Sequence, residues 1–309
     1  MSKPISLALV GIGKIARDQH IPSIAGNPAF RLDAAVSRHG RVDGVENFGD
    51  FDDFLKARPD VTAVSLCTPP DVRFDMAAKA IAAGRDVLME KPPAATIGEA
   101  EALASLARAA GVTLFSTWHS RFAVAVAPAK AWLAGKKIAD ISIVWKEDVR
   151  RWHPGQAWIW EPAGFGVFDP GINALSILTA LLDDPVLVDK ARLEVPSNRR
   201  QPIGATLSMR SSGGVPISAD FDWRQEGPQT WDITVKTNAG ILRLSKGGSE
   251  MYVDDKLVES GPDREYASIY ARFASLIETR TSDADFQPLR IVADAFLCGE
   301  TVLTDEFHD

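Results

Sequence analysis

Cysteine is nearly absent from this sequence, and histidine is rare. The 309 residues include two cysteines, Cys67 and Cys298, and five histidines that are scattered along the chain. Two isolated cysteines cannot build a disulfide framework. Together with the scattered histidines they provide no ligand cluster for zinc. The sequence therefore predicts neither structural disulfides nor a metal site.

Long hydrophobic runs and blocks of like charge are also lacking. No apolar stretch reaches the roughly 18 residues that a membrane-spanning helix needs. The 34 basic and 41 acidic residues give a formal charge of −7, and no basic cluster is present that would attract phosphate groups. The N-terminal MSKPISLALVGIGK reaches a turn before it could form the apolar core of an export signal. We expect a cytoplasmic protein that binds neither membranes nor nucleic acids and acts on a small molecule.

The first 120 residues show one kind of pattern, in which short apolar runs alternate with helical stretches. The helical stretches at 75–84 and 96–111 both end in glycine. This alternation predicts a parallel sheet with helices on both faces. Thr96 and Glu99 have the spacing of a capping box at the start of the second stretch. The apolar runs are residues 5–10, 31–37, 61–67, 85–90 and 112–116.

After about residue 120 the segments alternate apolar and polar residues, as antiparallel strands with one solvated face do. We therefore expect an α/β domain over 1–120 and an α+β domain over 121–309, with the boundary near 118–122. The second domain should hold a large, mostly antiparallel open sheet with helices on one face. Its expected strands are 141–149, 205–211, 216–223, 230–237 and 240–245, and its expected helices are 123–134, 170–182, 266–280 and 288–303.

A glycine turn follows the first apolar run. Gly11, Gly13 and Ala16 form the pattern G-x-G-x-x-A between an expected strand and an expected helix. In a dinucleotide-binding unit the first glycine permits the turn, the second lets a pyrophosphate approach the backbone, and the third position allows close packing. The helix N-terminus attracts the anion, and Lys14 and Ile15 complete the expected cofactor contacts. A glycine-rich connection without a ligand is the alternative.

The end of the second apolar run bears on the choice of cofactor. NAD-binding units carry an Asp or Glu about 20 residues after the glycine turn, whereas this run ends in Ser37, Arg38 and His39. A carboxylate would repel a 2′-phosphate, but Arg38 can form a charged pair with it and Ser37 can donate a hydrogen bond. We expect NADP as the preferred cofactor, with NAD also accepted. The alternative is that Arg38 is an ordinary surface arginine.

Glu90, Lys91 and Pro92 follow the core of the fourth apolar run. They stand at the carboxyl end of a buried strand, where open α/β sheets bind ligands. A lysine there could hold or relay a proton beside the reacting carbon, because burial can bring its pKa into a useful range. From the residues alone, a surface lysine that ends a strand before two chain-breaking prolines is an equally good interpretation.

Three motifs, GIGKIA, CTPP and MEKP, occur in this order in the first 92 residues. With them the chain resembles the Gfo/Idh/MocA oxidoreductase family along its whole length. The resemblance implies an NAD(P)-binding Rossmann domain followed by the α+β domain, a catalytic Lys91 and a cis Lys91–Pro92 bond. Within the family the chain is similar to bacterial aldose 1-dehydrogenases of the L-arabinose and D-galactose type. The further cofactor contacts that the resemblance implies are Thr68, Pro69, Glu90 and Lys91.

Asp169 and Asn173 lie four residues apart in an apolar segment. With Pro170 at the first helical position, Asp169 could simply cap a helix. Residues four apart also project from one end of a helix toward the same site. Many members of the resembled family carry a proton-accepting histidine where Asn173 stands, and an amide cannot act as a base. The acid/base work is therefore left to Asp169 or Lys91, without a choice between them, and Asn173 would orient hydroxyls and the carboxamide.

Six of the eight tryptophans lie between residues 118 and 160. Aromatic rings suit the C–H faces of a sugar, and neighbouring polar groups suit its hydroxyls. Trp145 and Glu147 alternate with their neighbours on an expected strand and therefore share one face. Core packing and solvated loops are the alternative roles for these residues. The substrate contacts that we expect are His119, Glu147, Trp152, His153, Asp169, Asn173 and Trp231.

Together the residues and the resemblance predict NAD(P)-dependent oxidation of the anomeric C1 of a free aldopyranose to the aldonolactone. The expected catalytic residues are Lys91, Asp169 and Asn173. An inositol dehydrogenase, or another polyol or sugar dehydrogenase of the family, is an alternative that the missing base histidine disfavours. A non-enzymatic NADP-sensing regulator is a second alternative, although it would need neither Lys91 nor Asp169. Arabinose, galactose and fucose are not ranked, and the family analogy adds a homodimer through the C-terminal sheet.

Overall fold

The protein, analysed as a computed structural model that describes residues 3–308, divides into two compact units. The first unit comprises Met1–His119 and Glu265–Phe286, and the second comprises Ser120–Arg264 and Gln287–Asp309. This division differs from the expected domains of 1–120 and 121–309 in one respect. The segment Glu265–Phe286, which was expected in the second domain, belongs to the first unit.

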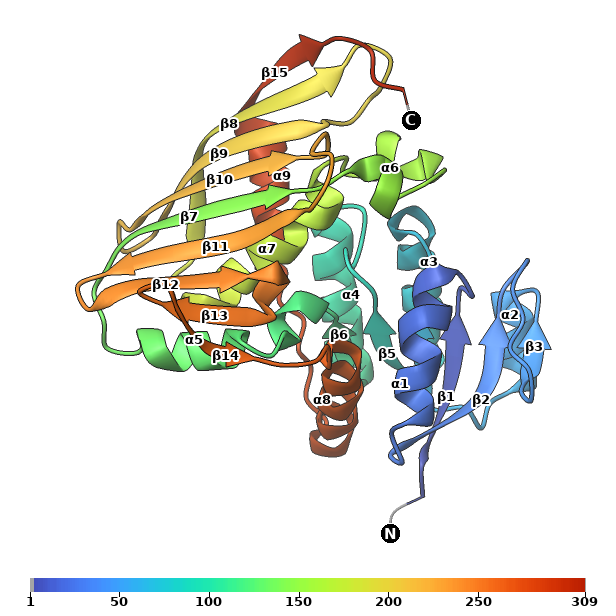
Figure 1. The fold of residues 1–309 in the computed structure, drawn as a ribbon. Coiled ribbons are helices and arrows are strands. Elements are labelled where there is room, and N and C mark those ends of the chain that lie inside the picture. Colours follow the sequence, from blue (N-terminus) through green and yellow to red (C-terminus); the bar gives the residue numbers. More distant parts are fainter. Residues whose placement is uncertain (1–2, 309) are drawn as a thin grey trace. The chain divides into compact units, whose positions relative to one another are not determined.

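The first unit is built on a six-stranded sheet in which every pairing is parallel (Figure 1). The five predicted apolar runs correspond to five of its strands. The sixth, β3, was not predicted, because it has only three residues and pairs with a single neighbour. In sheet order the strands are β3 (Glu46–Phe48), β2 (Phe30–Val36), β1 (Ile5–Val10), β4 (Ala63–Leu66), β5 (Asp86–Met89) and β6 (Leu114–Ser116).

Helices cover both faces of this sheet. Val64 and Leu66 pack in the cluster on the face of α2, α3 and α4, whereas Ser65 between them points to Tyr270 of α8 on the other face. The predicted capping box is confirmed at α4, where Thr96 Oγ1 accepts the Glu99 N–H at 3.2 Å and the Glu99 carboxylate accepts the Thr96 N–H. The helices are α1 (Ile21–Ala25), α2 (Phe51–Ala57), α3 (Pro70–Ala82), α4 (Ile97–Ala110) and α8 (Glu265–Thr279).

The helix α8 belongs to the first unit because its apolar side chains complete the core of that unit. Phe273 is fully buried and stacks on Phe30, with 5.7 Å between ring centroids, and on Phe115, with 6.2 Å. Phe30 begins β2 and Phe115 lies in β6, so one side chain contacts two strands of the sheet. A segment far along the sequence thus covers a face for which the first 120 residues supply only the short α1.

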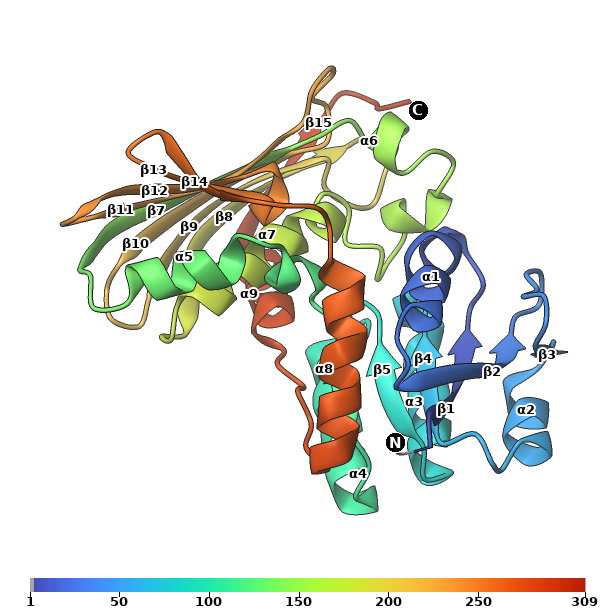
Figure 2. The same ribbon diagram turned by 60° about the horizontal axis from the view of Figure 1, so that its bottom comes forward.

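The second unit contains a nine-stranded sheet, mostly antiparallel, as predicted (Figure 2). Two of its eight pairings are parallel, β7 with β10 and β8 with β15. The strands β8, β13, β14 and β15 were not predicted. In sheet order the strands are β14 (Lys256–Ser260), β13 (Glu250–Val253), β12 (Gly240–Ser245), β11 (Thr230–Thr237), β7 (Ile138–Lys146), β10 (Pro216–Asp222), β9 (Gly204–Ser211), β8 (Val186–Pro196) and β15 (Gly299–Thr304).

Helices α5, α7 and α9 lie along one face of this sheet (Figure 2). The predicted helix at 288–303 is wrong in its last turn, because α9 ends at Cys298 and β15 begins at Gly299. A Cβ at Gly299 would lie 2.3 Å from the carbonyl oxygen of Ala295, so glycine is needed for this abrupt change. The helices are α5 (Val126–Leu133), α6 (Val149–Trp152), α7 (Phe168–Leu181) and α9 (Gln287–Cys298), with shorter helical turns at His119–Phe122, Ala157–Trp160 and Lys246–Gly248.

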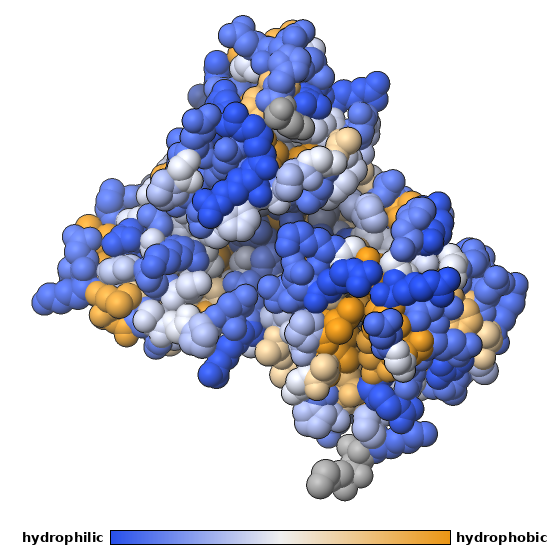
Figure 3. Space-filling model, turned by 45° about the vertical axis from the view of Figure 1, so that its right-hand side comes forward, coloured by the Kyte–Doolittle hydropathy of each residue, from blue (hydrophilic) through white to orange (hydrophobic). Residues whose placement is uncertain are grey.

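The core of the second unit forms between the sheet and α7. Inward residues of the strands alternate with exposed ones, as in β9, where Leu207 and Met209 are buried and Ser208 is exposed. α7 approaches β10 closely at Gly171, whose added Cβ would lie 3.1 Å from the ring of Phe221. Elsewhere the surface is largely polar. On the face in Figure 3, hydrophilic side chains predominate and hydrophobic ones gather in separate patches.

Replacing Phe273 by alanine should destabilise the first unit by about 3–5 kcal/mol, because it removes a buried ring that contacts two strands. Urea denaturation followed by tryptophan fluorescence measures the change. Leu297→Ala is the control, since that side chain is 83% exposed and its loss should change the free energy of unfolding by less than about 0.5 kcal/mol. Equal effects of the two substitutions would contradict the assigned role of α8.

Candidate cofactor and substrate sites

The carboxyl ends of the parallel strands bring the predicted cofactor residues to one edge of the six-stranded sheet. Gly11 follows β1, Ser37 follows β2, Thr68 lies just beyond β4, and Glu90 and Lys91 follow β5. The backbone pairing continues into these residues, because the Gly11 N–H donates to Val36 and the Glu90 N–H donates to Leu66. This edge is where open α/β sheets bind ligands.

The glycine turn has the geometry that a dinucleotide needs. Gly11 has φ +88°, and a Cβ there would lie 2.9 Å from the backbone of Cys67 and Thr68, so only glycine fits. Gly13 leads into a helix over 14–25, where its carbonyl oxygen accepts the Arg17 N–H at 3.2 Å. Lys14 and Ile15 occupy the first turn of this helix, with Lys14 paired to Asp18. The first N–H groups of such a helix can bind a phosphate group.

Two observations fit a bound dinucleotide at this edge. The Oγ1 atom of Thr68 is buried without a hydrogen-bond partner among the described residues, and a buried polar atom of this kind requires a partner. Pro69, the other predicted contact in this loop, precedes the first residue of α3. A small pocket beyond β2 and β3 is lined by Ser37, Arg38, His39, Gly40, Arg41, Asn47, Phe48 and Gly49.

This pocket occupies the place expected for the adenosine ribose. Ser37 Oγ accepts the N–H groups of Gly40 at 3.0 Å and His39 at 3.4 Å, which shapes the turn. Arg38 and Arg41 line the pocket, and no carboxylate is among its lining residues. Guanidinium groups can form charged hydrogen bonds with a phosphate group.

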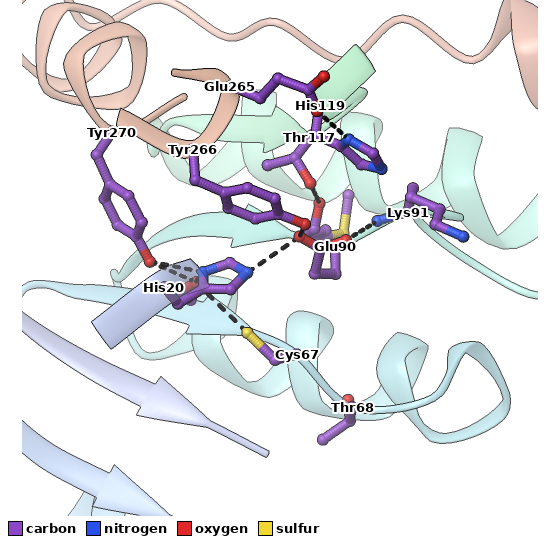
Figure 4. Close-up of polar contacts among 12 residues, drawn as sticks. His20, Cys67, Thr68, Glu90, Lys91, Thr117, His119, Glu265, Tyr266 and Tyr270 are labelled. Atoms are coloured by element: carbon purple, nitrogen blue, oxygen red, sulfur yellow. Dashed lines mark hydrogen bonds and ion pairs between the residues drawn. The ribbon is translucent and has the colours of Figure 1, made fainter. Parts of the chain in front are cut away.

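Glu90 lies at the centre of a buried polar network (Figure 4). Its side chain is only 3% exposed. Oε1 accepts hydrogen bonds from Tyr266 at 2.8 Å and from His20 Nε2 at 3.0 Å, while Oε2 accepts the backbone N–H of Lys91 at 2.9 Å. His20 Nδ1 lies 2.8 Å from the hydroxyl of Tyr270. The carboxylate therefore fixes the backbone at Lys91, whose bond to Pro92 is cis, as the resemblance implied.

The electrostatics of this network favour a charged pair. Burial acts to raise the pKa of the Glu90 carboxyl group, but the hydrogen bond and positive charge of His20, with His119 and Tyr266, lower it to about 2. Burial acts to lower the pKa of the His20 imidazole, yet its interactions with Cys67, Tyr270 and Glu90 raise it well above its usual value. Near neutral pH the network thus contains an ionised Glu90 and a protonated His20.

His119, predicted as a substrate contact, lies in the first unit beside this network (Figure 4). Its Nδ1 is 2.5 Å from a carboxylate oxygen of Glu265, and its ring stacks on Tyr266 at 5.6 Å between centroids. Burial acts to lower the pKa of His119, but Glu265 and Glu90 outweigh this effect and raise it. The imidazole can donate a hydrogen bond to a polar ligand.

Arg73 joins the two loops at this edge. Its buried guanidinium donates to the carbonyl oxygens of Thr68, Glu90 and Pro92, and so connects the loop after β4 with the loop after β5. The sequence analysis did not identify Arg73, His20, Tyr266 or Tyr270. One signal was available: the chain has only three tyrosines, and two of them lie four apart in α8.

The second unit brings together most of the predicted substrate residues. Asp169 lies inside α7, which begins at Phe168, and is therefore not the N-cap that the alternative interpretation required. It is 4% exposed, and Asn173 follows one turn later, half-buried. Because residues four apart on a helix are neighbours on its surface, Asp169 and Asn173 lie on one side of its first turns.

Glu147 is surrounded by tryptophans at the end of β7. Its carboxylate accepts indole N–H groups from Trp231 at 2.8 Å and from Trp223 at 3.3 Å, and is 3% exposed. Trp231 stacks on Trp145 at 5.7 Å between centroids and contacts Trp152 at 5.1 Å. Trp145 and Glu147 thus meet the same tryptophan, as their alternation in the sequence predicted. Trp223 is a member of the group that the sequence analysis missed.

His153 completes this group of polar residues. Its Nε2 atom lies 3.7 Å from Glu147 Oε1 and 3.7 Å from Asp169 Oδ2. The structure thus gathers five predicted contacts in one part of the second unit: Glu147, Trp152, His153, Asp169 and Trp231. Aromatic faces beside carboxylates and an imidazole form a surface that suits a polyhydroxylated ring.

The described residues lack both a cluster of metal ligands and a helix that could span a membrane. Within residues 3–308, no three side chains of His, Cys, Asp or Glu are placed to hold a metal ion together. The helices in that range also include none with the length and hydropathy to cross a bilayer.

Comparison with known proteins identifies the family. The model of the oxidoreductase family with an NAD-binding Rossmann fold, GFO_IDH_MocA, matches residues 5–117. Galactose 1-dehydrogenase from Pseudomonas fluorescens is 45% identical over 307 residues, which cover 99% of this chain and 100% of that protein. The crystal structure of D-galactose-1-dehydrogenase from Rhizobium etli has 51% sequence identity and a TM-score of 0.97, over 100% of this chain and 99% of that one.

More distant structures share the fold alone. A 3-ketoreductase from Actinomadura kijaniata, solved in complex with NADP and TDP-benzene, is 18% identical with a TM-score of 0.85, over 98% of this chain and 100% of that chain. The two near relatives match essentially the full length of the chain. The chain belongs to the Gfo/Idh/MocA family of oxidoreductases with an NAD-binding Rossmann fold.

Proposed function

We propose that this enzyme oxidises the anomeric C1 of a free aldopyranose of the D-galactose and L-arabinose type to the aldonolactone, with NADP as the preferred cofactor and NAD also accepted. The observation that carries the proposal is the full-length identity of 45% to a galactose 1-dehydrogenase. Both near relatives bear that name. The inositol dehydrogenase and the NADP-sensing regulator are therefore not retained.

The residues of the second unit account for sugar binding. The rings of Trp152 and Trp231 offer apolar faces to the C–H groups of a pyranose. Glu147, Asn173 and His153 supply hydrogen-bond partners for the hydroxyls. His119 in the first unit adds an imidazole N–H donor for a hydroxyl. Each of these side chains is proposed to contact the sugar.

Lys91, Asp169 and Asn173 are the proposed catalytic residues. NAD(P)⁺, when bound by the glycine turn and the loops after β2, β4 and β5, supplies the hydride acceptor. The cation of Lys91 stabilises negative charge that develops on the sugar O1. Asp169 accepts the proton of O1 as a carboxylate, and Asn173 orients the hydroxyls. Glu90 and His20 act indirectly, since they fix the backbone from which Lys91 projects.

We also propose that the open face of the nine-stranded sheet pairs with a second copy of the chain. This face is the one opposite α5, α7 and α9, and it presents Thr206, Ser208 and Ser218 beside ion pairs such as Arg210–Asp189 and Lys146–Asp220. Light scattering coupled to size exclusion measures the oligomeric state, and a monomer at micromolar concentration would contradict the pairing.

The function is tested with purified protein, NADP⁺ or NAD⁺, and D-galactose, L-arabinose, D-fucose and myo-inositol, by following absorbance of the reduced cofactor. The two aldoses named in the proposal should be oxidised and inositol should not. Lys91→Ala and Asp169→Ala should each lower kcat by roughly 10²–10⁴, the usual effect of removing a positioned acid/base group. Lys236→Ala, on the exposed surface, should leave kcat unchanged. Oxidation of inositol alone would contradict the proposal.

Arg38→Ala should lower kcat/KM for NADP by one to two orders of magnitude, about 1.5–3 kcal/mol, because a charged pair with the 2′-phosphate is lost. The value for NAD should change little. Steady-state kinetics with both cofactors at saturating sugar measures the two effects. Equal losses with NADP and NAD would show that Arg38 does not contact the 2′-phosphate.

The Glu90–His20 pair should make the stability of the first unit depend on pH. Because the Glu90 pKa falls from 4.5 to about 2 on folding, its contribution is present above pH 4.5 and is lost as the pH falls through about 2. Because the His20 pKa is raised from 6.5, its contribution is complete below pH 6.5 and is lost as the pH rises through the higher folded-state value. The pair therefore contributes most between about pH 4.5 and 6.5.

Glu90→Gln should lower the free energy of unfolding by about 3–5 kcal/mol in this window, because it leaves His20 buried without its counter-charge. The loss should shrink toward pH 2. Urea titrations at a series of pH values measure this, with the same exchange at the exposed Glu278 of α8 as the control. A loss that does not vary with pH would contradict the charged pair.

A further inference from the structure

One nitrogen atom in the second unit faces two buried carboxylates. His153 Nε2 lies 3.7 Å from Glu147 Oε1 and 3.7 Å from Asp169 Oδ2. Both acids are nearly inaccessible, at 3% and 4% exposure, whereas the His153 side chain is 17% exposed. Two carboxylates near one atom repel each other unless a proton or a positive charge lies between them. A proton on His153 Nε2 offsets this repulsion while both acids are ionised.

The two acids are not equivalent. Glu147 accepts two indole N–H groups, from Trp231 at 2.8 Å and from Trp223 at 3.3 Å. Hydrogen bonds to a carboxylate stabilise its ionised form, so Glu147 is suited to be a fixed negative charge. Asp169 lies in the first turn of α7, and is the acid to which the proposed function assigns the proton of the sugar O1. A proton on Asp169 therefore has His153 Nε2 beside it, and the Glu147 carboxylate contacts the same nitrogen.

The other nitrogen of His153 fixes the tautomer. Nδ1 lies 3.5 Å from Gln156 Oε1. An amide oxygen can only accept a hydrogen bond, so Nδ1 carries a hydrogen atom and Nε2 is the nitrogen that gains and loses a proton. The ring packs against Trp223 at 5.3 Å between centroids. Its orientation toward the two carboxylates is thus set by contacts on its other sides.

Other charged groups of the same short helix, α6, are engaged elsewhere. Arg150 forms ion pairs with Asp148 and Glu226. The guanidinium of Arg151 lies over the ring of Trp152, 5.2 Å from its centroid. Glu147 at the end of β7 and Asp169 on α7 are titratable groups of the second unit that face His153.

We propose that His153 is a proton relay, which takes from Asp169 the proton released by the sugar. The inference rests on the proposed function. As C1 gives up a hydride to NAD(P)⁺, the O1–H bond breaks, a C1–O1 double bond forms, and the proton moves to Asp169. His153 first gives its own Nε2 proton to water through the exposed part of the ring, and the freed Nε2 then takes the proton from Asp169. Asp169 returns to its ionised form, ready for the next turnover.

The pH dependence of kcat tests the relay. A proton acceptor must be deprotonated to act, so activity should fall at low pH, and His153→Gln should abolish this acidic limb. The variant should lose roughly 10²-fold in kcat, the lower end of what positioned proton transfer contributes. Exogenous imidazole should raise the kcat of His153→Ala at least tenfold. The control is Trp152→Phe, which should alter KM for the sugar and keep the acidic limb of the pH profile of kcat.

Two results would overturn the relay. If His153→Gln keeps the acidic limb and changes only KM, His153 contacts the sugar but does not relay its proton. If imidazole gives no recovery although His153→Ala is folded, as judged by circular dichroism, proton transfer does not pass through this position.

A measurement without substrate or cofactor separates the relay from the proposed function. The ring nitrogens of His153 can be titrated by NMR in ¹⁵N-histidine-labelled protein and assigned with His153→Gln. Removing either neighbouring charge, in Asp169→Asn or Glu147→Gln, should lower the midpoint by about one unit or more. Unchanged midpoints would overturn the relay whatever the activity. A coupled titration in a protein that oxidises no sugar would contradict the proposed function instead.

Discussion

The buried charge of Glu90 is the constraint on which the first unit depends. A carboxylate that is 3% exposed is costly unless every oxygen is paired. The partners come from three separate parts of the chain: His20 from the helix after the glycine turn, Tyr266 from α8, and the N–H of Lys91 itself. Satisfying this one group therefore fixes the helix after the glycine turn, the end of β5 and α8 together. The place of α8 in the first unit follows from it, along with the packing of Phe273.

Local patterns in the sequence predicted the elements whose structure is determined locally. The fully apolar runs became the strands of the parallel sheet, and the Thr96–Glu99 spacing formed the capping box. Elements that depend on a distant partner were missed. β15 pairs only with β8, more than a hundred residues earlier, and the signals within it, Gly299 and the β-branched residues after it, are weak beside the helical pattern that precedes them. The short β3 was missed for another reason: its three residues are too few to show a pattern.

The residues of the candidate site also fall into those that local patterns predict and those that only folding brings together. The glycine turn, in which Gly11 has a positive φ, could be predicted from the residues themselves, whereas the cis Lys91–Pro92 bond was implied only by the family resemblance. The group around Glu147 could be anticipated from the crowding of tryptophans, although Trp223 lies too far along the chain to be counted with them. The partners of Glu90 could not be found, because a histidine and two tyrosines become a network only after folding has brought residues 20, 90, 266 and 270 together. Tyrosine is rare enough here that its pairing in α8 was the one available clue.

Each unit holds a histidine against a buried carboxylate, and the two differ in access to water. His20 is fully buried, and its Nδ1–H donates to Tyr270, whose hydroxyl donates to Ser65, so every hydrogen bond of the ring is used within the protein. A proton held in this way cannot exchange during turnover, and the pair is a fixed support for Lys91. His153 is 17% exposed and stands 3.7 Å from its acids, slightly beyond hydrogen-bond length. The exposed side gives this ring a path to water that His20 lacks, as the proposed relay requires, and the ring and Asp169 must approach to hydrogen-bond distance when the proton passes.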